Sequence, residues 1–174
     1  MTDTTATLDL ELTGPTPKPA PVVVTFDAAE PQRVELADGT TIFIPAGAMP
    51  VSGTVTLRVV PIAALPSQRH ASVVAYGYIF LASDERGQPI EANFNQDVII
   101  TFPYDEARLQ QRGILESRLK PAYFSTTTNE WTFPESFVVD TAADRVTMQI
   151  DHFTRFALMG EAGGALMYLP LVIR

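Results

Sequence analysis

Short runs of alternating apolar and polar residues, each closed by a turn, constrain this chain more than any other feature. Val55, Leu57 and Val59 alternate with polar neighbours, which is the period-two pattern of a strand with one buried face. Further strand-like runs lie at 22–26, 34–36, 41–44, 73–81, 98–102, 119–124, 131–133, 137–140 and 146–156. Short strands separated by turns are typical of sandwiches. We therefore predict an all-β fold, a single antiparallel β-sandwich.

Three local signals refine this prediction. The dipeptide Asp38-Gly39 separates two apolar runs and predicts a hairpin turn. The run 73–81 is apolar at both parities, which favours a central place in a sheet. One short helix is expected over 106–111, with Asp105 as its N-cap and Gly113 at its end.

The length of 174 residues suits one domain with two tails. Residues 1–21 form a Thr- and Pro-rich arm, which we expect to be flexible because prolines favour extended polyproline conformation. The β-sandwich is expected over 22–160, followed by an apolar C-terminal tail, 161–174.

Both tails carry apolar residues. Leu8, Leu10 and Leu12 alternate in the arm and are compatible with a marginal edge strand. The stretch 165–173 is the longest apolar run, but it is too short to span a bilayer and contains Pro170. We expect no transmembrane segment, and the tail 165–173 is a candidate for an added β-strand on this domain or a neighbour.

Charge and composition exclude several classes of function. The formal net charge is −8, and no basic stripe is present, so we expect no nucleic-acid partner. The chain has no cysteine, which rules out disulfides and thiolate chemistry. Its two histidines lie far apart in the sequence and no metal-binding spacing occurs, so we expect no metal and no cofactor.

The tripeptide His152-Phe153-Thr154 is the one segment that suggests chemistry. A hydroxyl that attacks the preceding carbonyl replaces the amide by an ester, which water then opens. In this hypothesis Thr154 is the nucleophile, His152 is the base and Phe153 supplies the scissile carbonyl. The alternative is that all three are ordinary strand residues.

The faces of the last predicted strand bear on this choice. If pairing is continuous over 146–156, His152 and Thr154 face the core and Phe153 faces outward. That arrangement buries a polar ring and exposes an apolar one. A bulge or kink near Asp151 would break the alternation and would also strain the Phe153–Thr154 peptide bond.

A further hypothesis concerns the aromatic residues around Trp131. With Tyr123, Phe124 and Phe133, this side chain has the composition of a sugar-stacking platform, although such clusters also occur as sandwich core.

The segment 34–48, which ends in Ile44-Pro45-Ala46-Gly47-Ala48 and is followed by the run 53–57, resembles the opening of the ZU-five domain. That domain occurs in netrin receptors, ankyrins, tight-junction scaffolds and bacterial surface proteins. A His-Phe-Ser element near the domain end is a self-cleavage site in one member of the group, and His152, Phe153 and Thr154 are the matching residues here. The resemblance covers about residues 22–160.

Three functional hypotheses follow from the sequence. The first is a non-enzymatic structural or protein-interaction module, with a protein partner or neighbouring domains of a larger chain. The second is single-turnover self-cleavage between Phe153 and Thr154, and the third is carbohydrate binding. No signal peptide is visible, but the tail 168–174 resembles the ends of exported bacterial proteins, so we expect an extracellular or cell-surface setting.

Overall fold

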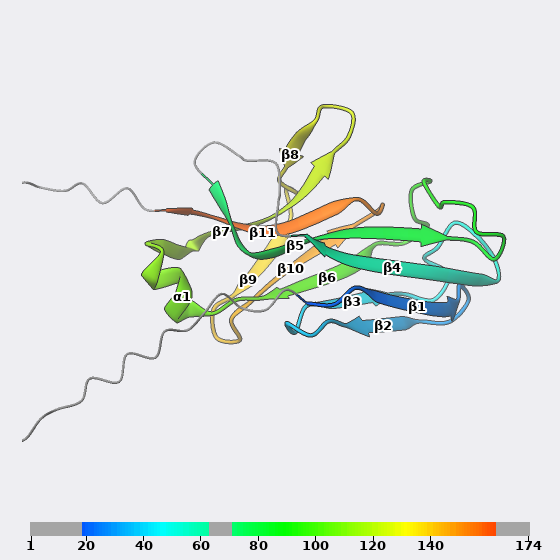
Figure 1. Cartoon of the computed structure of the whole chain (residues 1–174), viewed down its shortest axis with the longest axis horizontal. Helices are drawn as coiled ribbons and strands as arrows, with labels where there is room; N and C mark the ends of the chain where they lie inside the picture. The colour runs from blue at the N-terminus through cyan, green and yellow to red at the C-terminus, as the bar shows by residue number, and fades with distance from the viewer. Residues whose placement is uncertain (1–18, 63–70, 163–174) are drawn as a thin grey trace, which may run out of the picture.

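The computed structural model describes residues 19–62 and 71–162. In this part of the chain two antiparallel sheets pack together, with one short helix (Figure 1). Sheet A has the order β1 (Val22–Asp27), β4 (Thr54–Ile62), β5 (Ala71–Ser83), β11 (Arg155–Ala162), β7 (Ile114–Ser125) and β8 (Glu130–Thr132). Sheet B has the order β2 (Gln32–Glu35), β3 (Thr41–Ile44), β6 (Val98–Pro103), β10 (Arg145–Ile150) and β9 (Phe137–Asp140). The predicted antiparallel β-sandwich is confirmed.

The alternation of apolar and polar residues in the sequence corresponds to a buried and an exposed face in the strands. On β4, Val55, Leu57 and Val59 are at most 1 % exposed, whereas Arg58 points to solvent. Strand β11 lies between β5 and β7 within sheet A, and side chains on both of its faces are buried. Its even-numbered residues 156 and 158 belong to the main core, and residues 157 and 159 belong to a second cluster on the other face.

The helix and the hairpin form where the sequence predicts them. Helix α1 (Glu106–Gln111) is capped by Asp105, whose carboxylate accepts from the Arg108 amide at 3.2 Å. Gly113 follows the helix with φ of 66°. Gly39 turns the β2–β3 hairpin with φ of 85° and donates its amide to the Leu36 carbonyl.

The continuous last strand predicted over 146–156 is wrong. Strand β10 ends at Ile150 in sheet B, and β11 begins at Arg155 in sheet A. The four residues between them carry the chain from one sheet to the other, so the alternative of a break near Asp151 is confirmed. Strand β7 is also longer than predicted, because it begins at Ile114, which pairs with Ala162.

The predicted arm and tail fall largely outside the described part of the chain, which includes only 19–21 of the arm and 161–162 of the tail. The added strand at 165–173 is therefore still a prediction. Across the described residues, no helix is long and apolar enough to cross a membrane.

Gly160 lies where β11 and β7 pack closely together. A Cβ atom at this position would lie 2.5 Å from Ile114 Cγ2 and 3.3 Å from Leu119 Cδ2. The Ile114 methyl belongs to a β-branched side chain with few alternative rotamers, so it cannot swing aside freely. A glycine is therefore required here for packing.

We expect Gly160→Ala to lower the free energy of unfolding by about 1–3 kcal/mol through overpacking. Urea denaturation measures this. Ile114→Ala removes the atom that clashes, so the double variant should lose less stability than the sum of the two single variants. Additive losses would show that Ile114 is not the obstacle.

Candidate functional site

The corner between β10 and β11, residues Asp151 to Thr154, holds the predicted triplet. Two backbone hydrogen bonds fix its ends. The Phe94 amide donates to the Asp151 carbonyl at 2.6 Å, and the Phe80 amide donates to the Thr154 carbonyl at 2.9 Å. Phe80 belongs to β5 in sheet A, and Phe94 lies in the loop before β6 of sheet B. Segments far apart in the sequence therefore hold both ends of this short crossing.

Phe153 anchors the corner in the core. Its ring packs edge-on against Phe94, with centroids 4.7 Å apart, and against Phe80 at 5.6 Å. It is half-buried and packs against the main core cluster. The orientation predicted for a continuous strand, with Phe153 outward and His152 and Thr154 in the core, is therefore wrong, because the chain leaves sheet B before reaching these residues.

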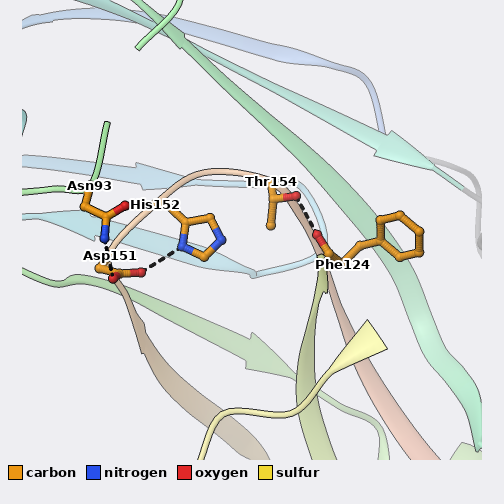
Figure 2. A network of polar contacts seen from close by, with 5 residues as sticks. All are labelled: Asn93, Phe124, Asp151, His152 and Thr154. Carbon is orange, nitrogen blue, oxygen red and sulfur yellow. Dashed lines mark hydrogen bonds and ion pairs between the residues drawn. The ribbon is translucent and has the colours of Figure 1, made fainter. Parts of the chain in front are cut away.

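His152 lies beside the carboxylate of its own neighbour. Its Nδ1 is 2.7 Å from Asp151 Oδ1, and Asn93 donates its side-chain amide to Asp151 Oδ2 at 3.1 Å (Figure 2). An ionised carboxylate only accepts hydrogen bonds, so Nδ1 is the donor in this contact, and in the neutral ring Nε2 is then the acceptor nitrogen. The ring also meets Tyr123 edge-on at 5.3 Å. This is the environment of an oriented base, with a side chain that is 35 % exposed.

The Thr154 hydroxyl donates to the backbone carbonyl of Phe124 at 2.9 Å. Figure 2 shows this hydroxyl turned toward Phe124 rather than toward the His152 ring. The contact joins the residue before β11 to the end of β7. The structure thus brings the three triplet residues into one corner but uses the hydroxyl as a structural donor. Attack on the Phe153 carbonyl would require the Thr154 side chain to give up this bond.

A groove of about 600 Å³ opens beside the corner. Its walls come from the end of β5 with the following loop, and from the end of β7 with the turn before β8. Leu81, which is 54 % exposed, contributes apolar surface, and Ser125, Thr126 and Thr127 contribute hydroxyls. A smaller hollow of about 240 Å³ shares Tyr123 and His152 with this groove. His152 therefore stands between two solvent-accessible hollows.

The aromatic side chains proposed for sugar stacking pack within the fold and do not line one open surface. Trp131 is only 5 % exposed and meets Phe124 edge-on at 5.5 Å. Phe133 packs against the same cluster, while Tyr123 lies on the opposite face of β7 with the main core. These four side chains do not form one open platform, which argues against the carbohydrate hypothesis. Within residues 19–62 and 71–162, no group of three His, Asp or Glu side chains is placed to hold a metal ion.

Sequence reasoning missed the partners that give the corner its geometry. Asp151 precedes His152 directly, so an adjacent carboxylate was visible in the sequence as a possible orienting group. Asn93 is 58 positions away from Asp151, and no local signal links the two. The carbonyl of Phe124 is a backbone group, which residue identity does not reveal.

A scan against protein-family models finds no match to this chain, and a search of curated proteins finds none either. The resemblance to the ZU-five domain is therefore still a prediction made from the sequence.

Proposed function

We propose that this chain is a non-enzymatic β-sandwich module with a structural or protein-interaction role, resembling the ZU-five domain. The proposal rests on one observation: two residues of the triplet make structural contacts at the corner between β10 and β11. Phe153 fills the space between Phe80 and Phe94, and the Thr154 hydroxyl bonds to the Phe124 carbonyl. Both side chains support the crossing between the sheets, which is a structural role.

Contacts with a protein partner, or with neighbouring domains of a larger chain, are favoured by the apolar side chains that the strands present to solvent. Val23, Leu81 and Val138 are 60 %, 54 % and 63 % exposed. Single exposed apolar residues are common, but Leu81 also lies on the wall of the groove. A cell-surface or extracellular setting is part of the proposal and rests on the tail sequence alone.

The proposal predicts one uncut chain of 19.0 kDa after long incubation near neutral pH. Intact mass under denaturing conditions measures this for the wild type and for Thr154→Ala. Thr126→Ala is a matched control, because it removes another hydroxyl from the same groove. Two fragments that meet at the Phe153–Thr154 bond in the wild type and in Thr126→Ala, but not in Thr154→Ala, would overturn the non-enzymatic role.

Self-cleavage is the second candidate, and the Asp151–His152 pair favours it. In this reaction Thr154 Oγ1 bonds to the Phe153 carbonyl carbon and its proton passes to His152. The bond from that carbon to the Thr154 nitrogen breaks, and the nitrogen takes up the proton. Water then hydrolyses the ester, which leaves a carboxylate on Phe153 and a free amine and hydroxyl on Thr154.

Denaturing conditions are necessary in that test because the smaller fragment would contain β11. This strand pairs with β5 on one side and with β7 on the other, so both fragments would remain in one folded molecule. Hydroxylamine provides a second check, since it attacks esters more readily than water does. A rise in the cut fraction with hydroxylamine, lost in Thr154→Ala, would identify the ester and support the second candidate.

A further inference from the structure

Strand β1 leaves one side of sheet A without a partner in the described part of the chain. It lies at the end of the strand order and pairs only with β4 (Figure 1). The Ala28 amide donates to the Gly53 carbonyl at 2.8 Å, which continues the β1–β4 ladder by one residue. Because backbone groups alternate sides along a strand, Val23, Thr25 and Asp27 direct their N–H and C=O groups to the open edge.

This edge has little of the usual protection against strand addition, since its one charged residue, Asp27, stands at the end of the strand. Lysine, proline and bulges commonly block an exposed edge, and β1 has none of them. Strand β2, at the corresponding edge of sheet B, instead exposes the charged residues Arg33 and Glu35. The open side of β1 is therefore available for strand pairing.

The inner face of β1 is also incompletely covered. Val22 and Val24 pack against the main core but are only half-buried. Their direct partners on β4, Val59 and Leu57, are at most 1 % exposed. A further strand beside β1, with apolar residues on the inner face, would complete the burial of both valines.

We propose that residues 8–12 of the same chain add an antiparallel strand to the open edge of β1. These residues lie outside the described part of the chain, and the argument rests on their sequence. Leu8, Leu10 and Leu12 alternate with Asp9 and Glu11. With the leucines on the inner face beside Val22 and Val24, the two acidic side chains lie on the outer face.

Charge and chain length agree with this placement. Arg58 is exposed on the outer face of β4, directly across from Val23 of β1, so it places a positive charge on the face where Asp9 and Glu11 would lie. Neighbouring strands are about 4.8 Å apart, a gap that the nine residues from 13 to 21 cross easily. Prolines in that connection keep it out of the sheet.

The tail of the same molecule is a poorer occupant. Strand β11 lies three positions from β1 in sheet A, so the new edge is four strand spacings away, or about 19 Å. Only residues 163 and 164 separate β11 from the apolar run at 165–173, and two residues reach about 7 Å.

Amide hydrogen exchange tests the proposal on the full chain. The amides of Val23 and Thr25 should exchange at least ~10-fold more slowly in the wild type than in Glu11→Pro. Glu11 lies on the outer face, so its N–H points to β1 in the proposed pairing, and proline removes that ladder hydrogen bond. The amides of Val24 and Phe26 face β4 and should be unchanged, which makes them internal controls. Thr4→Pro is the matched control, with the same substitution placed before the proposed strand.

The test also requires the molecular mass of the wild type in solution, which distinguishes a monomer from a dimer. Slow exchange at Val23 and Thr25 in a monomer, lost in Glu11→Pro and kept in Thr4→Pro, supports the proposal. Equal exchange in the wild type and Glu11→Pro overturns it. Slow exchange that appears only in a dimer would also overturn it, because the strand would then come from a second copy.

Discussion

Phe80→Ala is expected to lower the free energy of unfolding by about 3–5 kcal/mol. Phe80 is 1 % exposed, and its ring lies 5.1 Å from that of Phe156, 5.6 Å from Phe153 and 6.3 Å from Tyr78. Truncation leaves a cavity at the point where β5, β11 and the corner meet. Urea denaturation monitored by circular dichroism gives the change in stability.

Leu81→Ala is the matched control for that prediction. Leu81 is the next residue of the same strand but is 54 % exposed, so its truncation should cost less than about 1 kcal/mol. Losses of similar size at both positions would contradict the assignment of the two faces of β5. Phe153→Ala should also cost less in the Phe80→Ala background than in the wild type, because the contact between the two rings is already gone.

The fold was largely predictable because local patterns and tertiary packing agree along most of the chain. Alternating Val55, Leu57 and Val59 encode a one-sided strand, and this requires no knowledge of the neighbours. The hairpin turn at Gly39 and the cap at Asp105 are equally local, since both depend on residues within three positions. Such local signals identify individual strands, turns and helices, but they do not determine which strands pair with one another in a sheet.

The path of the chain through the corner was not predictable for the same reason. The parity of His152 and Phe153 indicates a break within 146–156, but it does not indicate that the chain crosses to the other sheet there. The crossing is fixed by the amides of Phe80 and Phe94, which lie more than fifty residues earlier in the chain. Tertiary hydrogen bonds overrode a local pattern here.

In the candidate site, too, local sequence signals were readable and contacts between distant residues were not. The triplet itself was found from residue identity, and its three members do meet at one corner. The role of each side chain depends on partners that the sequence does not connect to it. From the sequence, Thr154 is a candidate nucleophile. In the structure its hydroxyl donates to the backbone carbonyl of Phe124, and residue identity gives no sign of this contact because every residue has a carbonyl.

Two buried tyrosines are expected to make the stability of this protein sensitive to alkaline pH. The Tyr78 hydroxyl donates to Asp38 Oδ2, which ties β5 of sheet A to the β2–β3 turn of sheet B. Burial, and after it the hydrogen bond to Asp38, raises the pKa of Tyr78 well above its usual range. Burial, followed by the hydrogen bond to Glu116, likewise raises the pKa of Tyr104.

The sign of the effect follows from the direction of these pKa shifts. A raised pKa in the folded state means that the unfolded chain loses its tyrosine protons first, near pH 10. The contribution of each tyrosine is therefore complete below about pH 10 and falls as the pH rises toward the folded pKa. For Tyr78 the loss is up to about 1.4 kcal/mol per pH unit, and Tyr104 acts in the same direction.

We therefore expect the free energy of unfolding, measured by urea denaturation, to fall steeply between about pH 10 and pH 11.5. Tyr78→Phe should lose about 1–3 kcal/mol near neutral pH, because Asp38 keeps only its bonds from Thr40. The same variant should show a shallower alkaline slope, since one of the two tyrosines no longer titrates. An identical slope in Tyr78→Phe and the wild type would show that the hydroxyl between the two sheets does not control alkaline stability.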